Sequence, residues 1–442
     1  MRYLTLVVLA VAMASYGLEK PTMIGGAESK EAPPDTWPQW RGPSRDGLVA
    51  GAAWPQSLDE RHLTRQWRVE IAEGYSGPIV SSDHVFTFET KARRQEIVRA
   101  FERDSGKEVW SSESAGSMRV PFFAAKNGAW VRSTPAFDGE RLYVGGMRDV
   151  LFCLNARTGK EIWRVDFVKK YGTPLPSFGF VSSPLVMGNY VYVQAAASFL
   201  KLEKKTGKVA WRTLKDAGGM WGSAFSSPYP AKLAGKAQLL VQTRALLAGV
   251  DDKDGAVLWS RPIKAFRGMN ILTPTTSGDR VFTSSYGGGS AALDISRKPE
   301  GDLTTTIAWK NSTQGYMCTP IVLSGHAYLL LRNRRLTCID LNTGKETWPK
   351  RQRFGQYMSL ASDGKLILGL DQKGELVLFK ANPKEFELVG RRKVAKQETW
   401  GHIAVAGNQL FIRELKAISC WRWAARRPGP ARLPAPVAWP HR

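Results

Sequence analysis

Residues that commonly carry catalysis or bind metals are few in this chain, and they are scattered. Its 442 residues include five histidines, and none of them has the spacing of an H-E-x-x-H motif or of a paired metal site. The stretch DDKDG at Asp251–Gly255 is similar to the start of a calcium-binding loop, but the required Glu does not follow, so we interpret it as a turn. No G-x-S-x-G motif occurs. We therefore predict no catalytic residue and no metal site from motifs.

A second group of candidates is defined by position. Aromatic, charged and amide residues recur just before the first strand of a repeated unit, where the connections between units would meet a central funnel. Aromatic rings there could stack on a planar cofactor or a sugar, and arginine could pair with an acid or hold an anionic ligand. Packing of the channel wall is the alternative interpretation. The binding candidates are Glu73, Tyr75, Arg132, Asn270, Trp400 and His402, and similar positions hold Trp130, Phe178, Phe180, Trp221, Arg267, Tyr316, Gln356 and Tyr357.

Among these candidates, Arg132 is expected to pair with a neighbouring acid such as Glu73 or to await an anionic ligand, because an unpaired buried charge is costly. Trp400 would supply a stacking face. His402 and Asn270 would fix the orientation of a ligand by hydrogen bonds.

The elements that must position these residues belong to a repeat. The phrase LNARTGKEIWRV at 154–165 returns four more times in altered form, and a tryptophan always follows a glycine by four residues. Glycine adopts the positive φ of a tight hairpin turn at no steric cost. We expect each tryptophan to fill the gap between one repeat unit and the next. The pairs are Gly106/Trp110, Gly159/Trp163, Gly207/Trp211, Gly255/Trp259 and Gly344/Trp348.

Each unit begins with a small residue, usually followed by a proline and an apolar stretch, and eight such units occur. In the second unit, residues 134–137, 141–146, 150–156 and 161–167 have the composition of short antiparallel strands separated by turns. Four short strands in about 40–50 residues are typical of a propeller blade. The sequence predicts an all-β fold, an eight-bladed β-propeller of four-stranded antiparallel blades, over residues 37–423.

The ends of the repeat indicate how the ring closes. The eighth unit supplies three strands, whereas a spare fourth-strand phrase around Trp67 precedes the first unit. The N-terminal strand is therefore expected to complete the last blade by pairing with the segment around Cys420, which removes an open edge. Thr36–Gly47, which reads TWPQWRGPSRDG, is predicted to be a strap packed on the ring, with a binding lid as the alternative.

The two termini lie outside this pattern. Arg2, an apolar run and Ala12-Met13-Ala14 predict a secretory signal peptide over residues 1–14. Residues 15–36 are expected to be a flexible linker, and residues 424–442 a disordered tail rich in Pro and Arg. No cysteine near the cleavage site could carry a lipid, and the four cysteines are expected to be buried free thiols. These features predict a periplasmic or secreted monomer without a transmembrane segment.

The net charge is +24. For an exported protein, such a charge favours an envelope protein or an anionic envelope polymer as the partner, and disfavours nucleic acid. Solvated lysines in the repeat turns are the alternative explanation.

The unit S-x-P…G-x-x-Y-V…L-D-x-x-T-G-K-x-x-W, the lead-in WPQWRGPSRDG and the closing segment TWGHIAVAGNQLFIRELKAISCWRW resemble the pyrroloquinoline-quinone (PQQ) type of β-propeller repeat found in exported bacterial proteins. The resemblance covers roughly residues 37–423 and implies eight blades. For the family's alcohol and sugar dehydrogenases it implies a quinone with Ca²⁺ at the ring centre. This chain has no adjacent Cys-Cys pair of the alcohol-oxidising branch.

The non-enzymatic branch of that family includes the propeller lipoprotein of outer-membrane barrel assembly, whose lipid-bearing cysteine has no counterpart here. We therefore expect an exported, non-catalytic binding or scaffold protein of the bacterial cell envelope, with its ligand or partner at the central funnel and no assigned cofactor. A PQQ-dependent dehydrogenase of alcohols or sugars, using PQQ with Ca²⁺, is the alternative.

Overall fold

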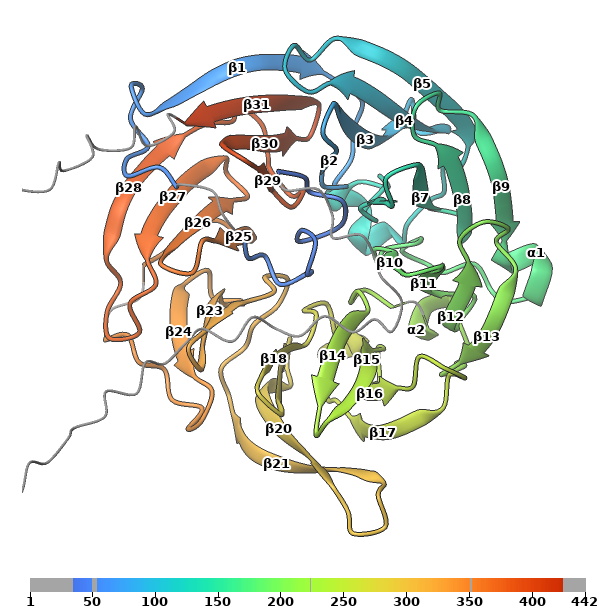
Figure 1. Cartoon of the computed structure of the whole chain (residues 1–442), viewed down its shortest axis with the longest axis vertical. Coiled ribbons are helices and arrows are strands. Elements are labelled where there is room, and N and C mark those ends of the chain that lie inside the picture. Colours follow the sequence, from blue (N-terminus) through green and yellow to red (C-terminus); the bar gives the residue numbers. More distant parts are fainter. Residues whose placement is uncertain (1–34, 50–53, 223, 350–351, 424–442) are drawn as a thin grey trace, which may run out of the picture.

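The structure is a computed structural model that describes residues 35–49, 54–222, 224–349 and 352–423. The predicted signal peptide, the linker up to residue 34 and the tail 424–442 lie outside the described residues. Within them, eight antiparallel sheets stand around a common centre as the blades of a propeller (Figure 1). The predicted all-β propeller of eight blades is confirmed.

Blades 1 to 4 each contain four consecutive strands. Blade 1 contains β2 (Ile79–Val80), β3 (His84–Lys91), β4 (Gln95–Glu102) and β5 (Glu108–Ala115). Blade 2 contains β6 (Ala136–Phe137), β7 (Arg141–Gly146), β8 (Val150–Asn155) and β9 (Glu161–Asp166). Blade 3 contains β10 (Leu185–Met187), β11 (Tyr190–Ala195), β12 (Ser198–Glu203) and β13 (Val209–Thr213). Blade 4 contains β14 (Tyr229–Leu233), β15 (Lys236–Gln242), β16 (Leu246–Val250) and β17 (Val257–Pro262).

The second half of the ring is less regular. Blade 5 contains β18 (Thr275–Ser277), β19 (Arg280–Ser285), β20 (Gly289–Arg297) and β21 (Leu303–Asn311). Blade 6 contains β22 (Ile321–Leu323), β23 (His326–Leu330) and β24 (Leu336–Asp340). Blade 7 contains β25 (Met358–Ser362), β26 (Leu366–Asp371), β27 (Glu375–Lys380) and β28 (Leu388–Lys393). Blade 8 contains β29 (Ala404–Ala406), β30 (Gln409–Glu414), β31 (Ala417–Trp423) and β1 (Leu63–Glu70).

Short helices lie in the connections between blades. They are the 3₁₀ helices η1 (Phe122–Asn127) and η2 (Phe266–Gly268), and the α-helices α1 (Phe167–Tyr171) and α2 (Gly219–Gly222). Because the strands of a blade are antiparallel, these connections and the turns between second and third strands lie at one end of the ring, here named the loop end. The turns between first and second strands and between third and fourth strands lie at the other end, named the turn end.

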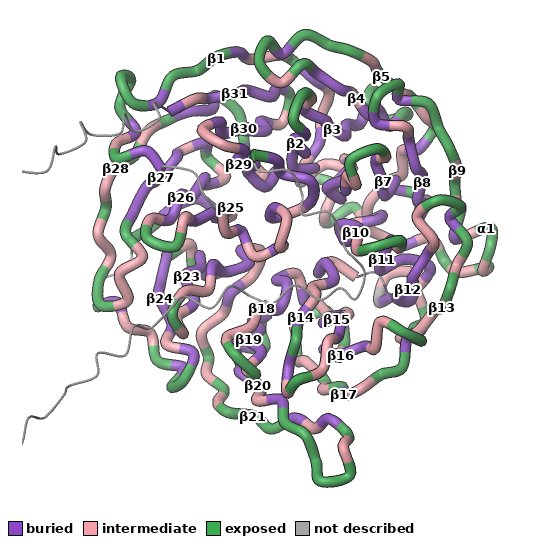
Figure 2. Tube along the Cα trace, viewed as in Figure 1, coloured by how far each residue is buried: buried purple, intermediate pink, exposed green. Residues whose placement is uncertain are grey.

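Burial follows the position of a strand within its blade. The middle strands β7 and β8 are almost continuously buried, whereas the outer strand β9 alternates between exposed and half-buried residues (Figure 2). A middle strand is buried on both faces because neighbouring blades pack on it, so its sequence is nearly continuously apolar. An outer strand borders solvent, which explains the charged residues that it carries.

The repeated Gly and Trp interlock neighbouring blades. Trp110 of blade 1 donates its indole N–H to the main-chain oxygen of Ala156 in blade 2, at 3.0 Å. Gly159 in the same blade 2 turn has φ 70°, and a Cβ placed on it would lie 2.4 Å from the Trp110 ring. A turn glycine therefore packs on the tryptophan of the preceding repeat. Five other tryptophans donate the indole N–H to a main-chain oxygen of the next blade in the same way. They are Trp67 to Arg103, Trp163 to Lys204, Trp211 to Asp252, Trp309 to Leu341 and Trp348 to Asn382.

One repeat tryptophan departs from this pattern. Trp259 donates to the side-chain oxygen of Gln238 within its own blade, at 2.7 Å. The turn that would have received it, in blade 5, is lengthened into the hairpin of β20 and β21, which extends beyond the ring in Figure 1. The insertion thus displaces the acceptor that the other tryptophans use.

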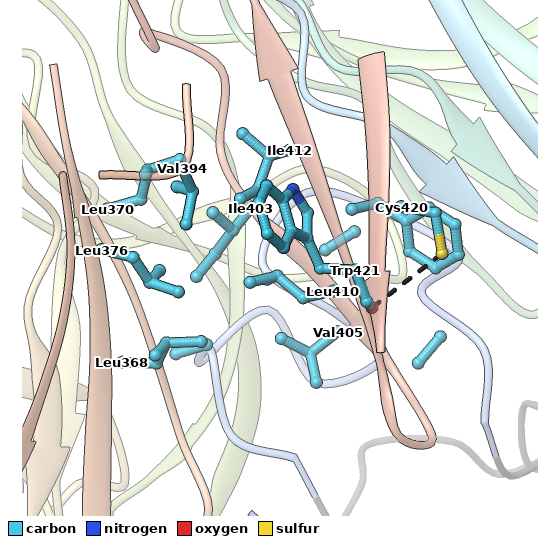
Figure 3. Packing of buried hydrophobic residues seen from close by; sticks show 14 of the residues in the cluster. Leu368, Leu370, Leu376, Val394, Ile403, Val405, Leu410, Ile412, Cys420 and Trp421 are labelled. Carbon is cyan, nitrogen blue, oxygen red and sulfur yellow. Dashed lines mark hydrogen bonds between the residues drawn. The ribbon is translucent and has the colours of Figure 1, made fainter. Parts of the chain in front are cut away.

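The N-terminal strand closes the ring. Strand β1 pairs with β31, and Trp67 lies opposite Cys420 in the register. The order of the last sheet, β1-β31-β30-β29, makes the N-terminal strand its outermost member. Apolar residues of blades 7 and 8, including Leu376, Leu410 and Trp421, pack together beside this seam (Figure 3). The predicted closure is confirmed.

Blade 6 differs from the expected four strands. In the described part of the chain it has three; two isolated bridges follow, Ile339–Glu346 on β24 and Arg335–Arg353 on the residue before it. Pro349 lies between Glu346 and Arg353. Since proline has no N–H to donate to a sheet ladder, a regular outer strand is disfavoured there.

Two further findings concern membrane association and cysteines. Within the described ranges, no helix is long and apolar enough to cross a membrane. All four cysteines are buried and free, as predicted: Cys153, Cys318, Cys338 and Cys420.

Candidate functional site

The predicted strap lies across the centre of the ring at its turn end (Figure 1). Trp37 exchanges two main-chain hydrogen bonds with Val80 of blade 1, at 2.7 and 3.0 Å. At the other end of the strap, Val49 donates to the main-chain oxygen of Ser362 in blade 7, at 2.8 Å. The two ends of the strap are thus bonded to the blades on either side of blade 8, and the Trp37 side chain is buried.

Two arginines of the strap are fully buried. Arg41 donates to the main-chain oxygen of Pro320 in blade 6 at 2.6 Å, and Arg45 donates to that of Pro184 in blade 3 at 2.7 Å. Both guanidinium groups lie over the ring of Trp40, at 5.6 and 5.4 Å from its centroid. Burial lowers the pKa of both arginines, and that of Arg45 falls to about 9. The turn end is therefore closed by a positively charged core.

His402 lies beneath the strap. Its imidazole ring stacks on Trp37 and meets Trp40 at an edge, with centroids 6.3 and 6.0 Å apart. The side-chain nitrogen Nδ1 lies 2.8 Å from the main-chain oxygen of Ile403. Burial, with a smaller contribution from the charge of Arg41, lowers the pKa of His402 to about 3, so the ring is neutral at pH 7.

Asn270 is also enclosed. It is fully buried, and its side-chain amide donates to the main-chain oxygens of Thr243 and Arg244 at 3.2 and 3.0 Å. His402 and Asn270 therefore pack in the inner wall of the ring, and they do not share an exposed surface with the other candidates. The strap explains why His402 is covered.

The remaining candidates meet at the loop end. Tyr75 contacts Trp130 at an edge with centroids 5.3 Å apart, and it contacts Trp400 at 5.7 Å. Trp400 stacks on Tyr357 at 5.8 Å with an interplanar angle of 20°, and its indole N–H donates to Glu398 at 2.9 Å. Connections into blades 1, 2, 7 and 8 thus form one cluster, named here the aromatic cluster.

Arg132 belongs to this cluster, but its partners differ from those expected. Its guanidinium lies 6.0 Å from the centroid of the Tyr75 ring and donates to the main-chain oxygens of Gly128 at 2.8 Å, and of Trp130 and Phe178 at 3.3 Å. The expected pairing of Arg132 with Glu73 is therefore wrong, whereas an anionic ligand for Arg132 stays a prediction. Three carbonyl groups satisfy it instead.

Glu73 makes its ion pair with Lys416, at 3.2 Å, and its main chain bridges to Thr90. It therefore lies at the loop end beside blade 8, apart from the guanidinium of Arg132.

A second series of rings continues around the loop end. Phe123 contacts Phe178 at 6.3 Å, and Phe178 contacts Phe225 at 5.4 Å. The Arg244 guanidinium lies 4.9 Å from the Phe225 centroid and donates to the main-chain oxygen of Arg267. Further round, Tyr286 contacts Phe266 at 5.0 Å and Tyr316 at 5.4 Å, and Arg332 covers Tyr286 at 4.0 Å.

Positions before first strands could not identify all of these residues. Tyr286, Arg244 and Arg332 lie in turns between second and third strands, which reach the same end of the ring. The signal that could have revealed them is an Arg or Tyr in each of these turns, which the antiparallel strand order brings to the same end as the connections. Phe180 is buried on the blade 3 side, and the side chain of Trp221 lies outside the described residues.

The residues near the axis do not fit a quinone with Ca²⁺. Trp400 already stacks on Tyr357, with Tyr75 at its side, so a planar ring would have to separate them. At the turn end, Trp40 and the two buried guanidinium groups occupy the centre. Across the part of the chain that the structure describes, no three His, Cys, Asp or Glu side chains converge as metal ligands would.

Comparisons with known proteins agree with this architecture. A family model described as "Outer membrane protein assembly factor BamB" matches residues 93–350, more than half of the chain. A protein of that name from Yersinia pestis is 22% identical over 387 residues, which cover 84% of this chain and 91% of that protein. The one from Escherichia coli K12 is 27% identical over 333 residues, covering 63% and 81%.

Solved structures show the same fold. The crystal structure of BamB from Moraxella catarrhalis has a TM-score of 0.58 at 15% identity and covers 82% of this chain and 98% of that one. A quinohemoprotein alcohol dehydrogenase from Pseudomonas putida has a TM-score of 0.52 at 12% identity and covers 95% and 84%. At such identities the likeness shows the propeller fold alone.

Proposed function

Because this chain belongs to the family of outer membrane protein assembly factor BamB, we propose that it is a non-catalytic scaffold that binds a partner of the outer membrane assembly machinery in the cell envelope. The family match supports this general role. The loop end is the surface on which we place the partner.

The observation that carries the proposal is the aromatic cluster of Tyr75, Trp130, Tyr357 and Trp400 with Arg132. Trp, Tyr and Arg are the residues most enriched among those that dominate binding at protein interfaces. The cluster draws on connections into four blades, so only the closed ring assembles it. At the turn end, by contrast, the strap buries its own aromatic and basic residues Trp37, Arg41 and Arg45.

Site-specific photo-crosslinking in the cells that make the protein tests this assignment. A photoreactive phenylalanine analogue replaces Trp130 or Trp400 at the loop end, and Lys160, exposed in a turn-end turn, serves as the control position. We expect irradiation to attach a component of the outer membrane assembly machinery at Trp130 and Trp400, identified by mass spectrometry, and not at Lys160. Crosslinks to that machinery from Lys160 alone, or from none of the three positions, would contradict the proposal.

A binding measurement with the captured partner then gives the energetic contribution. Trp400→Ala should weaken binding by about 2 kcal/mol, the loss typical of a central aromatic anchor. His402→Ala is the matched comparison, because His402 lies beneath the strap and contacts no loop-end surface. Equal losses for both variants would show that the cluster acts only through the stability of the ring.

A further inference from the structure

Aromatic side chains protrude at the loop end beyond the aromatic cluster. Phe122 begins η1 and is 91% exposed, and the adjacent Phe123 is 49% exposed. Their rings meet edge to face with centroids 5.7 Å apart. Phe266 begins η2 and is 48% exposed. Phe122, Phe123 and Phe266 are named here the aromatic prongs.

The remaining exposed large apolar residues differ from the prongs in type and place. Among the described residues they are all aliphatic and lie on outer strands around the rim of the ring, one to a strand. Single exposed aliphatic residues are ordinary on a protein surface, whereas a ring that is nine-tenths exposed at the tip of a connection is not. They are Val109, Ile162, Val257, Ile307 and Leu388.

The connections that carry the prongs are basic. Residues 114–137 and 255–278 contain no Asp or Glu. Arg119 lies near Phe122, and Lys264 and Arg267 flank Phe266; all three are exposed. The prongs are therefore accompanied by cations alone along their own segments, which favours an anionic partner.

Contacts between side chains link the connections that carry the aromatic prongs. Phe123 packs on Phe178, which packs on Phe225, and the guanidinium of Arg244 lies against Phe225. Arg244 in turn donates to the main-chain oxygen of Arg267, the neighbour of Phe266. Because this chain of contacts joins connections at the same end of the ring, the prongs can meet one flat surface together.

We propose that the loop end docks on an anionic lipid surface, with the aromatic prongs inserted at the headgroup boundary and Arg119, Lys264 and Arg267 against lipid phosphates. Aromatic rings favour the membrane interface, and anionic headgroups attract basic residues near the surface. A fluid lipid surface receives a protruding ring anywhere, whereas a folded partner would need a pocket for each prong. The prongs stand on the connections into blades 2 and 5, and the first of these also carries Trp130 and Arg132. Vesicle binding is measured without a protein partner, so its failure would overturn the lipid contact and leave the proposed partner site to its own test.

Vesicle binding tests the proposal directly. The probes are vesicles of phosphatidylcholine alone and of phosphatidylcholine with phosphatidylglycerol. We expect the mature protein to sediment with the anionic vesicles, to be released by high salt because the charge attraction is screened, and to remain free of the neutral vesicles. Phe122→Ser with Phe123→Ser should weaken partition by about tenfold or more, since both apolar contacts are lost.

Leu388→Ser is the matched control, because Leu388 is also 48% exposed but lies on the outer strand β28. It should bind as the parent does. Failure of the parent to bind anionic vesicles, undiminished binding by the Phe122/Phe123 variant, or an equal loss in the Leu388 variant would each overturn the proposal. Binding to soluble poly-glutamate in place of vesicles would assign the surface to an acidic polypeptide and overturn it too.

A second readout places the contact on the molecule. The four native thiols are buried, and burial raises their pKa values to about 11 or 12, so a polarity-sensitive thiol label reacts selectively with an introduced cysteine. On anionic vesicles, label at Phe122→Cys should shift its emission to the blue, and label at Leu388→Cys should not. Shifts of equal size at both positions would contradict docking through the loop end.

Discussion

At the turn end of the ring, Trp37, Arg41 and Arg45 are buried in a strap that crosses the centre; at the loop end, Phe122 is 91% exposed and Tyr75 and Trp400 are only half-buried. The same eight blades build both ends. What differs is the segment added to the repeat: a strap before the first blade at one end, and the connections between blades at the other. The comparison shows that the repeat fixes the positions, while the non-repeated segments decide which end is closed.

The two ends also differ in how they satisfy their arginines. Arg41 and Arg45 are fully buried, and their Nε groups have no hydrogen-bond acceptor among the described residues, although the Trp40 ring lies against both. At the loop end, Arg132 is satisfied by three main-chain oxygens. Unsatisfied buried donors are costly, so the strap must be held by its apolar and main-chain contacts and by the bonds that the terminal nitrogens of both arginines donate to Pro320 and Pro184.

The largest effect is therefore expected from the strap. Trp37→Ala should lower the free energy of unfolding by about 3–5 kcal/mol, the usual cost of deleting a buried large aromatic side chain. Trp130→Ala at the loop end should cost much less, because Trp130 is only half-buried. Urea denaturation of both variants measures the difference. Equal losses would remove the distinction between a closed end and an open one.

A buried charge gives the second test. Burial raises the pKa of Asp46, while the Leu48 N–H and the charge of Arg41 lower it. Arg41→Met would remove the charge that lowers the pKa of Asp46 and the hydrogen bonds to the main-chain oxygens of Asp46 and Pro320, and should cost about 3 kcal/mol. Arg41→Met combined with Asp46→Asn should recover part of that loss. Arg119→Met, at an exposed loop-end position, should change stability by no more than about 0.5 kcal/mol.

The response to pH should have opposite signs at the two ends. Glu96 is the second residue of β4, at the loop end, and accepts the Met147 N–H at 2.7 Å; burial raises its pKa to about 8. Its folded-state pKa lies above the ordinary value of 4.5, so its stabilisation is complete below about pH 4.5 and is lost as the pH rises through 8. Glu96→Gln should be more stable than the parent at pH 8.5 by about 2 kcal/mol.

His402 beneath the strap should respond in the other direction. Its pKa is lowered to about 3 in the fold, so its stabilisation is present above about pH 6.5 and declines as the pH falls toward 3. His402→Asn should flatten the acid side of the stability profile and leave the alkaline side unchanged. Thermal melting from pH 4 to pH 9 separates the two groups; an alkaline loss that persists in Glu96→Gln would contradict the assignment.

Much of the fold could be predicted because its signals are local. A turn glycine four residues before a tryptophan recurs in five of the eight units, and counting strands places β1 in the last blade. The missing strand of blade 6 also had a signal, Pro349, which interrupts the phrase that forms outer strands elsewhere. The local sequence therefore indicates the strands and turns of a unit, and packing between units adds their arrangement in the ring.

The candidate site was harder to predict, because its chemistry depends on main-chain groups and on the strap. Every residue has a carbonyl, so no sequence pattern shows that three of them converge on Arg132. Likewise, His402 precedes a first strand as Tyr75 does, but only the path of the strap determines that His402 is covered. The position of a residue just before a first strand therefore predicts where in the ring it lies, but not whether it is exposed.

The smallest effect is expected from adding PQQ with Ca²⁺. Tyr357 stacks on Trp400 with Tyr75 tilted at its side, and Trp40 with two guanidinium groups lies at the centre of the turn end, so among the described residues a planar quinone would have to displace one of these rings. The purified mature protein should therefore gain no quinone absorption after gel filtration and should melt at the same temperature with and without the pair, since a ligand that binds only the folded state would raise it. Trp400→Ala is the informative variant, because it removes the ring that fills the loop-end position. A chromophore retained by the parent and lost in Trp400→Ala would place a quinone in the aromatic cluster. The loop end would then be a cofactor site, and the turn end would still be closed by the strap.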